Sequence, residues 1–204
     1  MRKSKRQHLP MLRARDNPFQ SDRIERVRYR FPDRSSLELL LQRLKQLDYR
    51  GALVGPEGSG KTTLLEELNA RIQNLGYCTW LIRARAGPAG VDLPLQLGKN
   101  DVLLIDSAER LSWLEWRRLK WASRSAGGLV ITSHRPGLLP TLLECRTTPA
   151  LLTGIVRELT SLDDFNRLPP EHLGQLFAAH QGNIRGALRE LYNRANTGGS
   201  EPEV

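Results

Sequence analysis

Long apolar runs are missing from this sequence of 204 residues. No stretch approaches the roughly 18 apolar residues that a membrane-spanning helix needs. The basic N-terminus is not followed by the apolar segment of a secretory signal, and no internal repeats are found. These absences predict a soluble, cytoplasmic protein without a membrane span. The length fits one α/β domain, or one such domain with a small appendage.

Cysteine is also scarce, since the chain contains only Cys78 and Cys145. Each of them lies in an apolar stretch of the sequence. Two isolated cysteines do not make a disulfide framework or a metal cluster. We therefore expect both to be small core residues of a protein kept in a reducing compartment.

Acidic residues are the minority charge, with 22 Asp and Glu against 31 Lys and Arg and a net charge of +9. This balance fits a nucleic acid or another anionic partner, but it also fits cations spread over solvated faces. Residues 1–16 are basic and without periodicity, which predicts a disordered tail. Such a tail either holds nucleic acid electrostatically or is merely solvated.

The strongest signal is the stretch GPEGSGKT at residues 55–62, which fits the phosphate-loop pattern G-x-x-x-x-G-K-[ST]. Its glycines allow a tight turn whose N–H groups face a polyphosphate. An apolar strand is predicted before it at 51–54 and a helix after it, so the helix N-terminus would point at the phosphate. The residues predicted to contact ATP are Gly55, Pro56, Glu57, Gly58, Ser59, Gly60, Lys61, Thr62 and Thr63.

An acid ends a second buried strand, predicted at 101–106. A carboxylate there is well placed to hold Mg²⁺ together with the Thr62 hydroxyl, so the predicted metal ligands are Thr62 and Asp106. Many ATPases have a water-polarising glutamate directly after this acid, whereas Ser107 stands here. Glu109 could supply the base if the turn brings it inward, or it could cap the next helix.

Further elements follow from periodicity and turn residues. Strands are predicted at 77–82, 129–134 and 142–146, and residues 87–94 are predicted to form a loop. A helix is predicted to be capped by the pair Ser35-Ser36, with Ser35 and Glu38 forming a capping box. Later helices are predicted at 110–125, 150–159, 169–180 and 182–192.

The helix predicted at 110–125 carries three tryptophans among basic residues. Aromatic and basic side chains together can stack bases and bind phosphates. Core packing is the commoner explanation of such a stripe. We expect most of these tryptophans to be in the core, with one exposed at a partner surface.

The order of these motifs resembles that of the AAA+ ATPases, over residues 17–194. The similarity is to the compact bacterial kind, near the secretion and transposition helper ATPases and the origin-recognition type. A glycine-asparagine-isoleucine-arginine tetrapeptide at 182–185, within a helical C-terminal region, points to that family. The resemblance implies a P-loop parallel sheet flanked by helices at 17–149, a small all-α lid at 150–195, and a disordered tail at 196–204.

The resemblance also implies roles for individual residues. Arg185 would be the sensor-2 arginine that reaches the γ-phosphate, and either Ser133 or His134 would be the sensor-1 residue that positions the attacking water. Arg135 and Arg146 are the candidates for an arginine finger, which such proteins donate across an ATP-dependent oligomer. The arm at 17–31 would lie where the family contacts adenine.

The predicted function is therefore that of an ATPase using Mg²⁺, with slow or partner-stimulated hydrolysis that drives a conformational change acting on DNA or a protein. Ser107, and the short segment after His134 where the finger helix is nearly absent, keep a second hypothesis open. In it, ATP gates a binding module with little hydrolysis. A small-molecule kinase is less favoured, because no arginine-rich lid interrupts the core.

Overall fold

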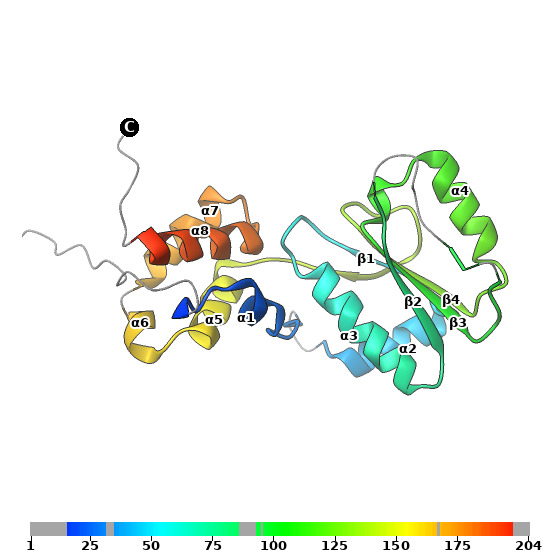
Figure 1. The fold of residues 1–204 in the computed structure, drawn as a ribbon, viewed down its shortest axis with the longest axis horizontal. Helices are drawn as coiled ribbons and strands as arrows, with labels where there is room; N and C mark the ends of the chain where they lie inside the picture. The colour runs from blue at the N-terminus through cyan, green and yellow to red at the C-terminus, as the bar shows by residue number, and fades with distance from the viewer. Residues whose placement is uncertain (1–15, 32–34, 86–92, 95, 167, 198–204) are drawn as a thin grey trace, which may run out of the picture. The chain divides into compact units, whose positions relative to one another are not determined.

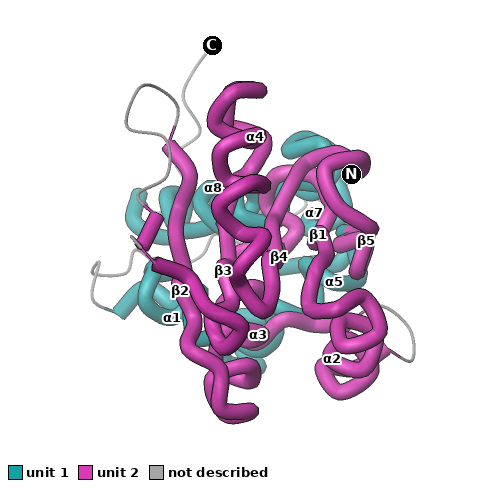
Figure 2. The backbone as a smooth tube through the Cα atoms, turned by 90° about the vertical axis from the view of Figure 1, so that its right-hand side faces the viewer, with its two compact units in different colours: residues 1–27, 147–204 teal, residues 28–146 magenta. Residues whose placement is uncertain are grey.

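The computed structural model describes residues 16–31, 35–85, 93–94, 96–166 and 168–197. The chain divides into two compact units, which are coloured separately in Figure 2. One unit comprises Arg28–Arg146, and the other comprises Met1–Val27 together with Thr147–Val204. The first contains the sheet and the second is helical.

A five-stranded parallel sheet forms the centre of the first unit (Figure 1). Its strands lie in the order β2-β3-β4-β1-β5, and every neighbouring pair is parallel. The strands are β1 (Arg50–Val54), β2 (Cys78–Arg83), β3 (Asp101–Asp106), β4 (Gly128–Ser133) and β5 (Thr141–Glu144). The predicted α/β class with a parallel sheet flanked by helices is confirmed.

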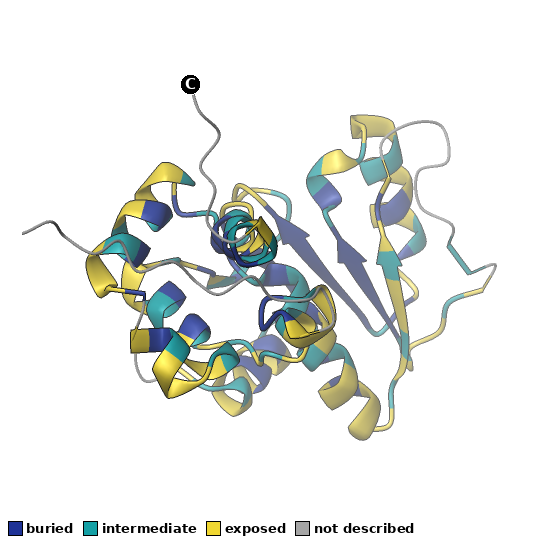
Figure 3. Cartoon of the chain, turned by 60° about the vertical axis from the view of Figure 1, so that its left-hand side comes forward, coloured by how far each residue is buried: buried dark blue, intermediate teal, exposed yellow. Residues whose placement is uncertain are grey.

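Helices cover both faces of this sheet, which explains its apolar strands. Because side chains alternate along a strand, Leu53 and Leu104 pack on one face with α2 (Leu37–Gln46) and α3 (Lys61–Asn74). The alternate residues Ile105 and Ile131 pack on the other face with Leu119 of α4 (Trp113–Ala122). Figure 3 shows these central strands as buried.

The edge strand β2 departs from this pattern. Cys78, Trp80 and Leu81 are exposed along it. The prediction that both cysteines lie in the core is therefore wrong for Cys78, because its strand has a neighbour on one side only. Cys145 is buried as predicted, and both cysteines are free thiols.

Strand β4 lies between the strand that precedes the glycine-rich loop and the strand that ends at Asp106. Val54 of β1 pairs with Ser133 of β4, and Ile105 of β3 pairs with Ile131. Since parallel strands end at the same edge of a sheet, the residues that follow β1, β3 and β4 gather there. The order of the strands thus places the polar end of β4 between the loop and Asp106.

Side-chain caps fix the first residue of two helices. Helix α2 begins after Ser36, whose Oγ accepts a hydrogen bond from Leu39 N–H at 3.3 Å. The cap is thus the second serine of the predicted pair, and the predicted capping box of Ser35 with Glu38 is wrong by one residue. Helix α4 has a capping box that the sequence analysis did not predict, formed by Ser112 and Glu115.

The tryptophans of α4 are more exposed than predicted. Trp113 is 65% exposed and Trp121 72% exposed, whereas Leu119 is the buried residue of this helix. Trp116 is half-buried. The expectation that most of the three tryptophans lie in the core, with one exposed, is wrong, because two are exposed and α4 packs on the sheet through its opposite side. The helix predicted at 110–125 begins only at Trp113, and a 3₁₀ turn, η2 (Ala108–Arg110), precedes it and overlaps the predicted range at Arg110 alone.

The second unit has its own apolar core. Phe19, Leu152, Leu173 and Leu188 are among its buried members. Its helices are α1 (Ser21–Glu25), α5 (Pro149–Leu159), α6 (Leu162–Asn166), α7 (Pro170–Ala179) and α8 (Ile184–Thr197), of which α1 and α6 had not been predicted.

A buried asparagine ties the N-terminal arm to this unit. Asn17 is fully buried, and its Nδ2 donates to Tyr192 O at 2.9 Å and to Asn196 Oδ1 at 2.8 Å. The arm at 17–31 was predicted to belong to the ATPase core at 17–149. The structure divides this arm, because residues 17–27 belong to the helical unit. Residues 196 and 197, predicted to begin the tail, continue α8.

Other predictions concern the parts outside this description. Residues 1–15 and 198–204 of the predicted tails, and residues 87–92 of the predicted loop, lie outside the described residues. Across the helices that the structure describes, none has both the length and the apolar character needed to cross a bilayer.

Candidate nucleotide-binding site

The glycine-rich loop between β1 and α3 needs its glycines. A side chain at Gly55 would place its Cβ only 2.4 Å from the carbonyl oxygen of Cys145. Gly60 has a φ of 82°, a left-handed conformation that glycine adopts readily. Its missing side chain also admits the ring of Tyr29, which would lie 3.1 Å from a Cβ there.

Helix α3 starts directly at this loop without a side-chain cap. Its N-cap is Gly60, and among the described residues this cap makes no side-chain hydrogen bond to the first turn. The first N–H groups of a helix have no partner within the helix, so those of Thr62 and Thr63 are available to an acceptor. Such a helix end favours an anion. In the loop itself, Ser59 Oγ donates to Pro56 O at 2.8 Å, and Glu57 is exposed.

Lys61 is a buried cation in this loop. It is 8% exposed, and its Nζ donates to the carbonyl oxygens of Gly55 and Pro56, each at 2.7 Å. Within the described part of the chain, none of the ion pairs includes Lys61. Burial lowers its pKa, while Glu109 and Asp106 are among the groups that oppose the shift. A buried ammonium held only by neutral carbonyls favours an anionic ligand.

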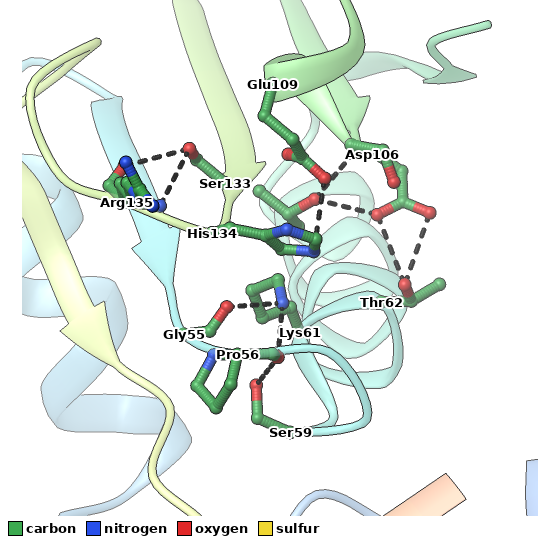
Figure 4. A network of polar contacts seen from close by, with 12 residues as sticks. Gly55, Pro56, Ser59, Lys61, Thr62, Asp106, Glu109, Ser133, His134 and Arg135 are labelled. Atoms are coloured by element: carbon green, nitrogen blue, oxygen red, sulfur yellow. Dashed lines mark hydrogen bonds and ion pairs between the residues drawn. The ribbon is translucent and has the colours of Figure 1, made fainter. Parts of the chain in front are cut away.

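Thr62 and Asp106 bring oxygen atoms together beside Lys61. The Thr62 hydroxyl lies 3.2 Å from each carboxylate oxygen of Asp106, which is buried at the end of β3 (Figure 4). Hard cations such as Mg²⁺ prefer oxygen ligands, and Mg²⁺ commonly uses one or two protein groups plus phosphates and waters. The two residues therefore fit the predicted Mg²⁺ ligands.

Two further residues hold the Asp106 carboxylate. The Thr132 hydroxyl donates to Asp106 Oδ1 at 2.8 Å, and Arg83 Nε donates to Oδ2 at 3.2 Å. Neither residue had been predicted to belong to the site. Thr132 comes from β4 and Arg83 from β2, the two neighbours of β3. Only the order of the strands reveals these contacts, although the polar end of each strand was visible in the sequence.

Ser107 turns the chain so that Glu109 lies inward. Ser107 has a φ of 63°, and its N–H donates to the Thr132 hydroxyl at 2.7 Å. Glu109 then lies with Oε1 3.3 Å from His134 Nε2, and its Oε2 is buried without a hydrogen-bond partner among the residues that the structure describes. Of the two alternatives for Glu109, the structure shows the inward one. An unpartnered buried carboxylate oxygen is free to accept a proton or a hydrogen bond.

The two sensor-1 candidates have different surroundings. Ser133 is buried, and its hydroxyl donates to Arg135 O at 2.9 Å. His134 is exposed and faces Glu109 (Figure 4). Of the two arginine-finger candidates, Arg135 is exposed, and Arg146 pairs with Glu144 at 2.9 Å.

Tyr29 supports the loop from outside and was not assigned a role from the sequence. Its N–H donates to Glu67 of α3 at 2.6 Å, and its ring stacks edge-on against Phe31. Burial raises the pKa of the Tyr29 hydroxyl, with further contributions from the charge of Cys145 and a hydrogen bond to it. Tyr29 thereby connects α3 with Cys145, whose carbonyl oxygen lies against Gly55.

The tetrapeptide at 182–185 starts α8 in the helical unit. Gly182 has a φ of 82°, Asn183 Oδ1 accepts the Gly186 N–H at 2.9 Å, and Ile184 joins the core. Arg185 is exposed in the first turn. Arg185 and Lys61 belong to different units, so neither unit alone contains both.

The candidate site is thus described from the loop, the strand ends and the helix start of this chain alone. Neither the known protein-family models nor the curated proteins give a match to this sequence.

Proposed function

We propose that the site at the ends of β1, β3 and β4 binds ATP with Mg²⁺ and hydrolyses it to ADP and phosphate. The observation that carries this proposal is the buried Lys61 ammonium, which has only carbonyl partners and lies at the uncapped start of α3. A helix N-terminus and a buried cation together form a strong anion site. The paired oxygens of Thr62 and Asp106 beside it favour a phosphate–metal complex over a simple anion.

Each residue then has a role in the proposed reaction. Lys61 exchanges its carbonyl partners for the β- and γ-phosphate oxygens. Thr62 and Asp106 hold Mg²⁺, which would neutralise phosphate charge when bound. Glu109 accepts a proton from the attacking water as the new oxygen–phosphorus bond forms and the bond to ADP breaks. His134 holds Glu109 in place for this role.

Kinship with the AAA+ ATPases forms part of the proposal. It is supported by the order of the motifs and by a parallel α/β sheet followed by a helical unit. In that setting Arg185 would stabilise the γ-phosphate charge. Arg135 and Arg146 would be the finger candidates in an assembly of several copies.

A binding titration tests the proposal directly. ATP affinity is measured for the wild type, for Lys61→Ala, and for Lys99→Ala as a control at an exposed lysine. We expect only Lys61→Ala to lose ATP binding, and equal affinity of all three proteins would refute the site. Asp106→Asn, measured with Mg²⁺ and with EDTA, should bind ATP equally in both. Wild-type affinity should fall when EDTA removes the metal.

A nucleotide-gated switch with little hydrolysis is the second candidate. It is favoured by Ser107 next to Asp106, where no carboxylate can polarise water. The two candidates differ in their turnover once ATP is bound. Rapid phosphate release by the protein alone would exclude the switch, whereas ATP binding with negligible release would support it.

A further inference from the structure

Helix α4 presents an aromatic and basic surface to the solvent. Trp113 is 65% exposed, Leu114 61% and Trp121 72%. Three exposed cations accompany these apolar side chains. We define the α4 surface as Trp113, Leu114, Arg117, Arg118, Lys120 and Trp121.

The aromatic and cationic residues of this surface alternate along one line. Trp113, Arg117 and Trp121 are spaced four residues apart, so they lie on one side of the helix, about 6 Å apart along its axis. The Arg117 guanidinium lies 4.7 Å from the centre of the Trp113 ring. This cation–π contact orients both side chains. The fold does not need this side of α4, since Leu119 anchors the helix from the opposite side.

The charge of α4 is strongly one-sided. The helix contains three cations, Arg117, Arg118 and Lys120, and one acidic residue, Glu115. The Glu115 side chain is engaged in the capping box with Ser112. The exposed residues Arg110 and Arg124 add positive charge at the two ends. The result is a concentrated positive patch on a chain whose net charge is +9.

We propose that the α4 surface binds single-stranded nucleic acid, with bases stacked on Trp113 and Trp121 and phosphates paired with the cations between them. Aromatic side chains interleaved with basic ones suit unpaired bases, which offer faces for stacking and a charged backbone. A duplex keeps its bases stacked within the helix and would leave both tryptophans unused. An acidic peptide would pair with the charges alone, and an apolar protein surface would have to bury three cations without partners.

The surface adjoins the candidate nucleotide site. A pocket of about 310 Å³ between η2 and the end of β4 is lined by Glu109, Ser133 and Arg135, and also by Trp113 and Trp116 of α4. A base stacked on Trp113 would therefore lie at the mouth of the pocket that contains Glu109. This consequence rests on the proposed function, whereas binding to the α4 surface does not.

The test measures the binding of a fluorescein-labelled oligothymidine by anisotropy, at low salt and without ATP. We expect Trp113→Ala and Trp121→Ala each to raise the Kd about five- to a hundredfold. Trp80→Ala is the matched control, because Trp80 is also exposed, at 42%, but lies on β2. Lys61→Ala should bind the oligonucleotide as the wild type does. Failure of the proposed ATP site would therefore be seen in the ATP titration and not in this oligonucleotide assay.

Salt dependence gives the second measurement. A triple variant with Arg117, Arg118 and Lys120 each changed to Gln should reduce the slope of log K against log salt by about 2, since each phosphate contact on a single strand contributes about 0.7. The proposal is overturned if the oligonucleotide does not bind at low salt. It is also overturned if the Trp113 and Trp121 variants bind like the wild type, or if a duplex binds as tightly as the single strand. Binding of an acidic peptide in place of the oligonucleotide would also overturn the proposal and would make the α4 surface a peptide-binding site.

Discussion

The Thr132 hydroxyl donates a hydrogen bond to the Asp106 carboxylate at 2.8 Å and accepts one from the Ser107 N–H at 2.7 Å. One buried side chain of β4 thus fixes both the proposed metal ligand and the turn that follows it. The same turn brings Glu109 to within 3.3 Å of His134. The geometry of the candidate site therefore depends on a residue that contacts neither phosphate nor metal in the proposed reaction.

Replacing Thr132 should show this dependence. Thr132→Val leaves the Ser107 N–H without its acceptor and removes one hydrogen bond from Asp106. The free energy of unfolding should fall by about 1–3 kcal/mol, measured by urea-induced unfolding. ATP affinity in the presence of Mg²⁺ should fall as well. Thr132→Ser keeps the hydroxyl and should retain most of both, so equal behaviour of the two variants would contradict the positioning role.

Replacing Glu109 should slow ATP hydrolysis without weakening ATP binding. In Glu109→Gln the side chain keeps its size but can no longer accept the proton from water. We expect phosphate release to fall about 10²- to 10⁴-fold while ATP affinity changes little. Glu171→Gln, at an exposed carboxylate of α7, is the control and should release phosphate normally. Unchanged turnover in Glu109→Gln would mean that another group activates the water.

Gly55 should tolerate no side chain. In Gly55→Ala the new methyl group would lie 2.4 Å from the backbone oxygen of Cys145, so the loop or β5 must shift. We expect a loss of about 1–3 kcal/mol in the free energy of unfolding. Gly174→Ala is the opposite case, because that glycine lies inside α7 with open space around it. It should stabilise the protein by about 0.5–1 kcal/mol. Thermal unfolding of both variants checks the contrast in sign.

The helical unit should lose stability in acid through Glu190. Burial alone would raise the pKa of Glu190, but hydrogen bonds from His180 and Arg194 outweigh it and hold that pKa below its ordinary value. A carboxyl group whose pKa is lowered in the folded state stabilises the protein above its unfolded-state pKa. This contribution is lost as the pH falls through the folded-state pKa.

An acid titration followed by circular dichroism measures that loss. Glu190→Gln should have a shallower dependence of stability on pH between about pH 5 and pH 2, because the titrating group is gone. Glu171→Gln is a control at an exposed carboxylate of α7. Identical acid unfolding of the wild type and Glu190→Gln would show that the contacts with His180 and Arg194 do not stabilise the folded state.

The local elements around the candidate site could be predicted from neighbouring residues in the sequence. Continuous apolar runs that end in polar residues, at 101–106 and 129–134, predicted strands that the structure contains almost to the residue. The glycines of the loop and the periodicity after Lys61 predicted the turn and α3. Such signals depend on neighbours within a few positions along the chain, so they can be read without tertiary contacts.

The order of the strands in the sheet and the exposed faces of the helices could not be predicted from the sequence, because they depend on packing between distant segments. The contacts of Asp106 with Thr132 and Arg83 arise because β3 lies between β2 and β4. Trp113 and Trp121 are exposed because α4 packs through Leu119, a choice that its mixed apolar pattern did not specify. Strand order and helix orientation are set by packing between segments far apart in the chain, and local periodicity carries no record of that pairing.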